Sequence, residues 1–319
     1  SPCRRSAMPV VPRTLSAVSW GTITLCLLPW ATMADPLAVI DNEGFGATMT
    51  AFTMDLPVGW SGTGKVIWNK PCSGNDLYEV SLTATSADGQ SGIRMKPGHQ
   101  VQWVDTSVDG SVDPYIAQLA VAQAEALKNE MRTRFRGSNC HFGKLAGTEA
   151  QVTQQLLQVL ILPDLPAGAR VTGMAPNSPT LALYKSTAAP GMAGFFSRYD
   201  AQIIDLAYDG PTGPMVERLF LTWSQYGTDP ATPALPGFPK SEFQTLILDT
   251  ITFVYAPAGR AGDIEVAVAA VKSTRVDPAW QEELRKVQAR IAEQQQKAQK
   301  DRSDAFDRQN KAFLDTIMQ

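Results

Sequence analysis

The residue types best suited to nucleophilic or metal chemistry are scarce in this chain, which has two histidines and four cysteines among 319 residues. His141 directly follows Cys140, while Cys72 and His99 lie earlier in the chain. A zinc site usually includes a closely spaced pair of cysteines or histidines, and this chain has none. A Cys–His nucleophile pair stays open only between His99 and a cysteine, because adjacent residues on a strand face opposite ways. We therefore predict no catalytic residue, no metal site and no cofactor.

One glycine-rich segment has the glycine and lysine spacing of a phosphate-binding loop. It runs from Gly59 to Lys65 (GWSGTGK). That chemistry needs a Ser or Thr after the lysine and a helix that begins beneath the phosphates. Val66 follows instead, and the letters VIWN are typical of a strand. We interpret the segment as a glycine-rich turn that leads into a strand.

Two pairs of carboxylates could serve acid–base chemistry, namely Asp105 with Asp109 and Asp205 with Asp209. Glycosidases need two carboxylates about 5 to 10 Å apart, a distance that sequence spacing alone does not establish. The chain has neither a Gly-x-Ser-x-Gly nor a His-Glu-x-x-His motif. Solvated acids at strand ends are the stronger interpretation of both pairs.

The N-terminal region has the order of a cleavable signal peptide. Met8 suits an initiator, a charged segment ends at Arg13, an apolar stretch covers 15–28, and small residues precede Asp35. The alternative is a membrane anchor, but the apolar stretch is shorter than the ~20 residues of a bilayer span. We therefore assign residues 1–34 to a signal peptide and predict Met8 as its true start. The protein is expected to be secreted or periplasmic and to have no later membrane segment.

Cleavage at that position would change both the charge and the cysteine count. Three arginines and no acid leave with the signal peptide, so 25 basic and 31 acidic residues remain, a net charge of −6. This balance argues against nucleic acid as a partner. Cys72 and Cys140 are the cysteines that remain, and in an oxidising compartment an even number favours a disulfide between them. The alternative is two separate buried thiols.

The first half of the remaining chain combines short strands with two helices. Asp113-Pro114 suits the start of a helix that ends near Gly137, and Thr148 with Gln151 matches a capping box for a second helix that Pro163 ends. The first helix is expected to dock through Ile116, Leu119, Ala120, Leu127, Met131 and Phe135. Strands are expected at 47–56, 64–69, 77–86, 91–95 and 100–104.

The second half continues with strands and a closing helix. The clearest pattern is a long hairpin of 198–208 and 214–226, and weaker strands are expected at 169–174 and 181–184. Residues 263–272 fit a strand or a helix. The closing helix is expected to begin at Ser241 and to bury Phe243, Leu246, Ile247, Ile251 and Val254.

Two loops each allow a functional and a purely structural interpretation. Residues 227–240 carry a proline at every third position from Pro230 to Pro239, which suits either a polyproline II ligand or a stiff surface connection. Residues 186–195 could cover a pocket or turn a corner between elements.

The last segment has the composition of a long polar helix. Asp277-Pro278 suits a helix start, and residues 279–319 contain neither Gly nor Pro. Trp280, Leu284, Val287 and Ile291 step by 4, 3 and 4 residues, which is the spacing of a coiled-coil seam. These four residues are the predicted interaction surface, and the simpler alternative is that they dock on their own domain.

The chain resembles the PsbP-like proteins, which include photosystem subunits and related exported bacterial proteins. The resemblance rests on the strand, Pro, x, Gly, Trp order of Phe52 to Trp60 (FTMDLPVGW) and on the closing helix, which is expected to reach Thr252-Phe253. The tail from Val276 to Trp280, which leads into a Gln-rich helix, is similar to tails of uncharacterised exported bacterial proteins. The resemblance implies an α+β domain over 35–262, with a mostly antiparallel sheet flanked by helices, followed by a connector and long helix over 263–319.

Proteins of such a fold are mostly binding or assembly factors, so the resemblance favours a non-enzymatic role. We expect an exported binding or assembly protein of the cell envelope, with a small ligand or with a protein partner that contacts the C-terminal helix. A subunit that stays with one complex is a further possibility. The alternative from another class is an exported hydrolase whose pocket in the β-rich domain is lined by His99 or His141 together with a carboxylate.

Overall fold

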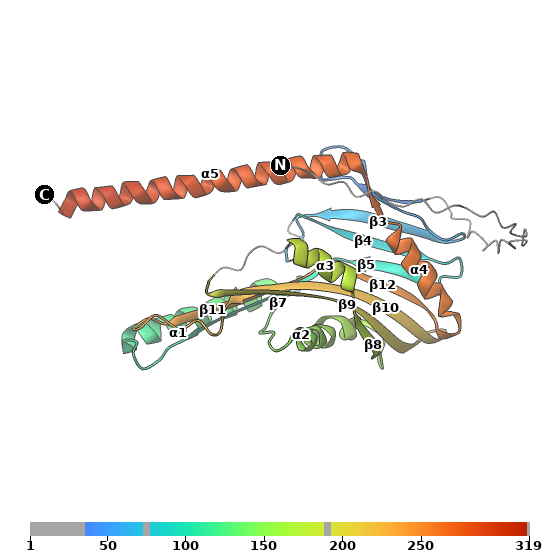
Figure 1. The fold of residues 1–319 in the computed structure, drawn as a ribbon, viewed down its shortest axis with the longest axis horizontal. Helices are drawn as coiled ribbons and strands as arrows, with labels where there is room; N and C mark the ends of the chain where they lie inside the picture. Colours follow the sequence, from blue (N-terminus) through green and yellow to red (C-terminus); the bar gives the residue numbers. More distant parts are fainter. Residues whose placement is uncertain (1–35, 73–76, 188–192, 318–319) are drawn as a thin grey trace, which may run out of the picture. The chain divides into compact units, whose positions relative to one another are not determined.

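The computed structural model describes residues 36–72, 77–187 and 193–317. The predicted signal peptide lies outside these residues, so the signal peptide and the export that depends on it stay predictions. Part of the 186–195 loop lies outside them too. The described chain has an α+β fold with a mostly antiparallel sheet and a C-terminal helix, which confirms the coarse prediction (Figure 1).

Thirteen strands in the described residues form one sheet, in which only the β1–β3 and β6–β7 pairs are parallel. The strands expected in the first half and the long hairpin are all present. The strands are β1 Leu37–Asp41, β2 Met49–Met54, β3 Ser61–Trp68, β4 Tyr78–Thr85, β5 Gly92–Lys96, β6 His99–Ser107, β7 Cys140–Phe142, β8 Arg170–Pro176, β9 Phe195–Gly210, β10 Gly213–Thr228, β11 Lys240–Leu248, β12 Ile251–Pro257 and β13 Arg275–Val276.

The sheet divides into two branches at β10. One edge of this strand pairs along its whole length with β9. The other edge pairs with β12 over Met215–Phe220 and with β11 over Trp223–Gly227. The β12 branch continues through β5 and β4, whereas the β11 branch continues to β6 and β7. Asp249 and Thr250 connect β11 to β12 and therefore lie at the fork, where the Asp249 N–H donates to the Thr222 carbonyl at 3.0 Å.

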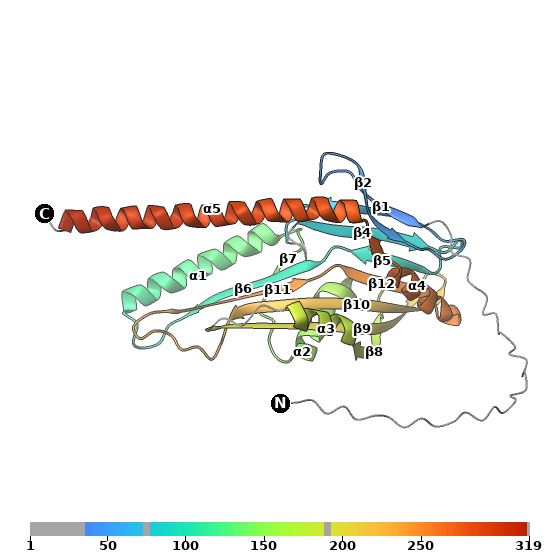
Figure 2. The ribbon, with the colours of Figure 1, turned by 45° about the horizontal axis from the view of Figure 1, so that its top comes forward.

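The helices pack on both faces of the sheet, as Figures 1 and 2 show. Residues of β9–β12 that face α2 form one core, which includes Leu219 and Trp223. The opposite face of β12, with Val254, packs with β1–β5, α4 and the first turns of α5 in a second core. The helices are α1 Pro114–Phe135, α2 Glu149–Leu156, α3 Ser178–Thr187, α4 Gly262–Lys272 and α5 Pro278–Ile317.

The predicted helix starts at Asp113 and Thr148 are confirmed. The Asp113 carboxylate accepts from the Tyr115 and Ile116 N–H groups, and Thr148 and Gln151 form a complete capping box. After α2 the chain continues through a π-helical turn over Leu157–Ile161, and a short 3-10 turn contains Pro163.

Two secondary-structure predictions were wrong. The segment that begins at Ser241 is a pair of strands, β11 and β12, and not a helix. Its apolar spacing fits a helix, but the segment is rich in β-branched residues and alternates in burial at Gln244, Leu246 and Leu248. Residues 181–184 lie in α3 and not in a strand. The ambiguous 263–272 segment is helix α4, whose Ala267 is fully buried in the core.

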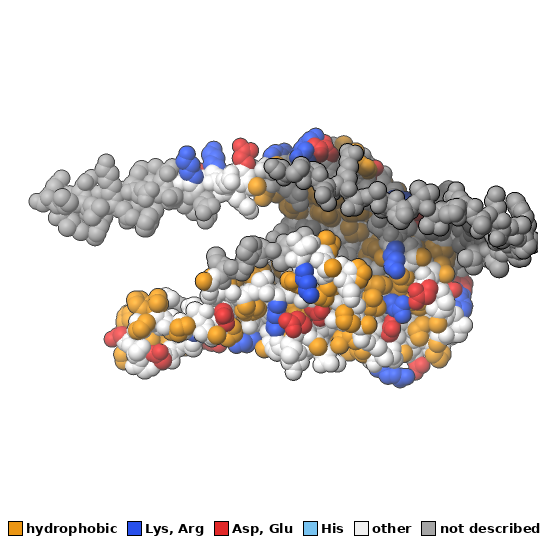
Figure 3. All heavy atoms as spheres, viewed as in Figure 1, with side chains coloured by type: hydrophobic (Ala, Val, Ile, Leu, Met, Phe, Trp, Pro, Cys, Tyr) orange, Lys and Arg blue, Asp and Glu red, His pale blue; other side chains and the backbone are white. Residues whose placement is uncertain are grey.

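The predicted docking stripe of α1 is wrong in half of its six members. Ile116, Leu119 and Leu127 are exposed, whereas Ala120 and Met131 are half-buried and Phe135 is buried. The helix contacts β6 and β7, and its buried residues are Ala124 and Phe135. Large apolar residues surround more than one side of this helix, so their spacing does not define a single face. Figure 3 shows hydrophobic side chains at the surface of the tip that α1 and the β10–β11 connection form.

Helix α5 is anchored at its start by a buried polar and aromatic cluster. The Trp280 indole is 1% exposed and donates to Asp41 at 2.7 Å, and Trp68 donates to the same carboxylate at 3.0 Å. The ring of Trp280 also packs on those of Phe52 and Tyr78. Trp280 therefore connects the helix to β1, β2 and β4.

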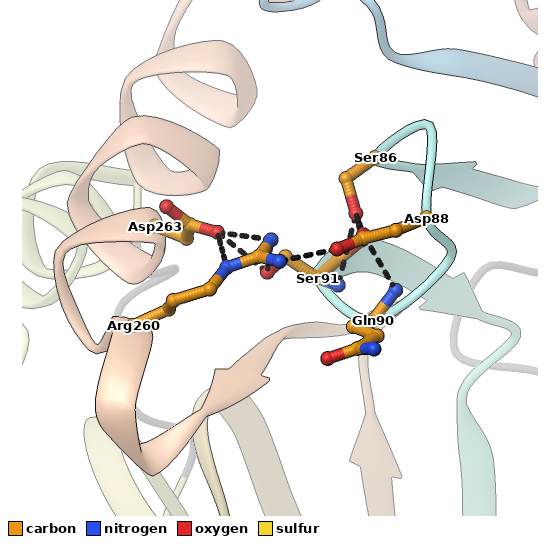
Figure 4. A network of polar contacts seen from close by, with 6 residues as sticks. All are labelled: Ser86, Asp88, Gln90, Ser91, Arg260 and Asp263. Carbon is orange, nitrogen blue, oxygen red and sulfur yellow. Dashed lines mark hydrogen bonds and ion pairs between the residues drawn. The ribbon is translucent and has the colours of Figure 1, made fainter. Parts of the chain in front are cut away.

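A second polar network fixes the start of α4 to the turn between β4 and β5, as Figure 4 shows. The Arg260 guanidinium pairs with Asp88 of the turn and with Asp263 of the helix, at 2.7 Å in the second case. It also donates to the Ser91 hydroxyl at 2.8 Å. The hydrogen bond that Ser86 donates and the pair with Arg260 hold the pKa of the Asp88 carboxyl far below its usual range. All these groups are satisfied within the network, which supports a structural role.

Candidate ligand-binding cavity

A cavity of about 750 Å3 lies at the fork of the sheet. Near it, β4 pairs with β5 only over Leu82–Thr85, so Tyr78–Ser81 pair with β3 alone. The separation leaves room between this part of β4, the Asp249–Thr250 connection and α3. The volume falls in the range of about 300 to 1,000 Å3 that is usual for small-molecule sites.

The walls of the cavity are mainly apolar, and their apolar strand residues come from β1, β2, β4 and β5. Because these strands belong to one continuous part of the sheet, with β3 between β1 and β4, they hold these side chains on a rigid surface. Aromatic rings contribute from three elements, with Phe52 on β2, Tyr78 on β4 and Tyr184 on α3. The aliphatic and thioether part of the lining consists of Val39, Met54, Val80, Leu82 and Met95.

The polar part of the lining consists of two carboxylates, their hydrogen-bond donors and three further threonines, Thr180, Thr222 and Thr274. Glu79 is 1% exposed, and its Oε2 accepts a hydrogen bond of 2.7 Å from the Thr250 hydroxyl. Asp249 accepts a short hydrogen bond from the Tyr184 hydroxyl. Among the described residues that line the cavity there is no Lys, Arg or His. Every charged group in this described lining is therefore acidic.

The titration of these groups reflects burial and the proximity of the two carboxylates. Burial, together with a smaller effect of the negative charge of Glu79, raises the pKa of Asp249 to about 6 against the lowering effect of the Tyr184 hydrogen bond. Burial and the charge of Asp249 raise the pKa of Tyr184. Burial and the charge of Glu79 do the same for Tyr78. A cavity with perturbed acids of this kind is a candidate functional site.

Local structure explains how α3 places its side chains. Thr180 and Tyr184 are one helical turn apart, so both reach the cavity from one face of α3. The Tyr184 ring also packs against Tyr199 of β9, with centroids 6.0 Å apart. Leu183 is not among the lining residues and is 61% exposed. The helix therefore forms one wall of the cavity through a single face.

The structure brings the two histidines together at another place. His99 Nδ1 and His141 Nε2 are 3.1 Å apart, next to each other on β6 and β7. Burial lowers the pKa of His99 to about 4, with added effects from the charges of His141 and Lys70. Burial also lowers the pKa of His141. Both rings are therefore neutral near pH 7.

His141 lines a second cavity of about 910 Å3 beside α2. Its described lining contains four glutamines and Lys144 but no carboxylate. The predicted hydrolase needs a carboxylate beside a histidine, and the described part of this cavity does not supply one. Within the same described residues, no group of three or more Cys, His, Asp and Glu side chains could hold a metal ion.

The remaining candidate residues of the sequence have structural partners. Cys72 and Cys140 form the predicted disulfide, with Cα atoms 4.9 Å apart. Gly59 ends a turn before β3, as expected, but β3 already begins at Ser61, so most of the segment predicted as a turn lies in the strand. The paired carboxylates do not form a site: Asp105 pairs with Lys128, and Asp205 pairs with Arg218.

The four predicted interaction residues divide into two pairs. Trp280 and Leu284 are buried in the core, whereas Val287 and Ile291 are half-buried. The burial of the first pair favours the alternative that these residues dock α5 on its own domain. The role of the four residues toward a partner stays a prediction.

The cavity residues themselves were missed by sequence reasoning. Asp249 lay inside the helix expected to begin at Ser241, so its position in a two-residue connection was hidden. For Glu79 the sequence offered one signal, because it is the single acid in the otherwise uncharged strand segment YEVSL. A charged residue in a strand that becomes buried usually has a partner or a ligand.

Comparison with known proteins adds no family. No protein-family model matches this chain, and no curated protein matches it. Within the described residues, no helix combines the length and apolar character that a bilayer crossing requires.

Proposed function

We propose that this chain is an exported, non-enzymatic binding protein that holds a small apolar molecule in the cavity at the fork of its sheet. The observation that carries the proposal is a cavity of about 750 Å3 with apolar and aromatic walls. Most of the walls belong to neighbouring strands, which need little reorganisation on binding. The Cys72–Cys140 disulfide supports an oxidising compartment. The relation to PsbP-like proteins stays part of this proposal.

A matched pair of α3 variants tests the cavity with the neutral fluorophore Nile red. Thr180→Trp adds bulk at a position that lines the cavity, and Leu183→Trp adds bulk at an exposed position of the same helix that does not line it. We expect Thr180→Trp to weaken Nile red binding by about tenfold or more, because the indole occupies the ligand volume. Leu183→Trp should bind like the unaltered protein.

Thermal melting of both variants provides the control for folding. Equal affinity in both folded variants, or no Nile red binding by the unaltered protein, would contradict the proposal. If Thr180→Trp does not fold, Met95→Trp takes its place in the test, because it fills the same cavity from β5.

A second candidate function rests on the exposed part of α5. After the buried Leu284, all side chains from Ala292 to Ala298 are exposed. A polar helix that projects from its anchor offers a surface to a protein partner of the cell envelope. Figures 1 and 2 both show the helix continuing past the strands.

Truncation after Ala289 tests this second candidate, because it keeps Trp280, Leu284 and Val287 in place. We expect the truncated chain to lose a partner that the complete chain retains from an envelope extract. Nile red binding by the truncated chain shows that its body is folded. Identical partner sets for both chains would remove the candidate.

A further inference from the structure

We propose that the ligand of the fork cavity carries a positively charged ammonium group on an apolar body. This inference rests on the proposed function, because it names the chemical class of ligand for the same cavity. The geometry points to it through two features of the lining that lie on different elements: two carboxylates close enough to affect each other's charge, and three aromatic rings in the same lining.

The carboxylates are held where a ligand cation could replace water. Glu79 is almost fully buried, and Thr250 holds it by a hydrogen bond from the β11–β12 connection. Asp249 is held by Tyr184 from α3. A cation is favourable beside two carboxylates in a cavity of low dielectric constant, because its charge interacts strongly with theirs. An ammonium group has three N–H donors and could donate to oxygens of both acids.

The aromatic rings favour the same ligand charge. Phe52, Tyr78 and Tyr184 line the cavity together with the acids. Ring faces attract cations, and aromatic surroundings are a common feature of sites for ammonium ligands. The remaining apolar walls suit a hydrocarbon body. An anionic ligand such as a fatty acid would meet two acids and no cation among the described lining residues.

The charged and titratable groups that face Asp249 set the expected dependence on pH. They are Glu79 from β4 and Tyr184 from α3; Tyr78 is the other titratable residue of the described lining, which contains no base. Below about pH 6 Asp249 is protonated and attracts a cation less. Affinity for an ammonium ligand should therefore rise as pH increases from about 5 to about 7 and then level off, because Asp249 is then ionised.

Three ligands with one hydrocarbon chain and different head groups test the inference. Decylammonium, 1-decanol and decanoate are titrated calorimetrically below the concentrations at which they form micelles. We expect decylammonium to bind about tenfold tighter than 1-decanol or more, and decanoate to bind most weakly. Only decylammonium should show the rise in affinity with pH.

The variant Glu79→Gln, Asp249→Asn removes both charges and keeps the shapes of the side chains. It should reduce the preference for decylammonium over 1-decanol to less than about threefold, while 1-decanol binds as before. Glu130→Gln, an exposed acid of α1, is the matched control and should keep the full preference. If the double variant does not fold, Asp249→Asn alone should remove the pH dependence.

The outcomes separate this inference from the proposed function. Equal binding of decylammonium and 1-decanol by the unaltered protein would overturn the inference and leave the apolar cavity in place. An ammonium preference that persists in the double variant would overturn it too. Failure of all three ligands and of Nile red would overturn the proposed function itself.

Discussion

At the scale of single residues, the described chain uses buried acids for two different purposes. Asp41 is fully satisfied by two tryptophan N–H groups and two backbone N–H groups, so it serves to anchor α5. Asp249 and Glu79 share one cavity, and each receives a hydrogen bond from another element. Asp249 and Glu79 therefore line a cavity that could hold a ligand, whereas Asp41 serves only to anchor α5.

Asp249 should make the free protein less stable as pH rises. Its pKa of about 6 in the folded state is above the ordinary value of 3.8, so the folded state holds a proton that the unfolded state releases. The stabilisation is complete below about pH 4 and is lost as pH rises through about 6. Relative to Asp249→Asn, the free energy of unfolding should fall by up to about 3 kcal/mol over this window.

Urea unfolding of both proteins at a series of pH values measures this difference. Glu130→Gln serves as the control and should follow the unaltered protein at every pH. A constant difference between Asp249→Asn and the unaltered protein from about pH 4 to about pH 7 would refute the assignment of the raised pKa.

At the scale of elements, α1 shows an unusual division between its apolar residues. Tyr115 is 73% exposed, and Ile116, Leu119 and Leu127 are exposed as well, although Ala124 is buried. Leu119→Lys should therefore change the free energy of unfolding by less than about 0.5 kcal/mol. Ala124→Lys should destabilise by about 2 kcal/mol or more, because it adds a charge and volume at the contact with β6 and β7.

Urea unfolding also compares these two variants. A large destabilisation by Leu119→Lys would show that the predicted docking stripe of α1 is buried after all. Equal effects of both variants would contradict the orientation of the helix.

Local signals allowed most elements to be predicted from the sequence. The Asp113 and Thr148 caps and the long hairpin depend on neighbouring residues, so sequence reasoning could identify them. The segment after Ser241 failed because its apolar residues fit both a helix and two strands. The choice depends on pairing with β10 and β6, which are distant in the chain. Tertiary context of this kind overrides local preference.

At the scale of the whole molecule, the candidate site depends on topology that no local pattern contains. Glu79 and Asp249 are distant in the sequence and become neighbours only because β10 pairs with two successive strands on one edge. The division of the sheet creates the cavity, and α3 adds a wall to it. A prediction from sequence could therefore obtain the α+β class, the disulfide and the start of α5, but not the site.

The most direct test of the central claim is a crystal structure of the protein with decylammonium. We expect the hydrocarbon chain to lie among Phe52, Leu82 and Met95 in the fork cavity. The ammonium nitrogen should lie within hydrogen-bonding distance of Asp249 and Glu79. A fork cavity without ligand, or a ligand bound instead in the cavity beside His141, would refute the proposed site.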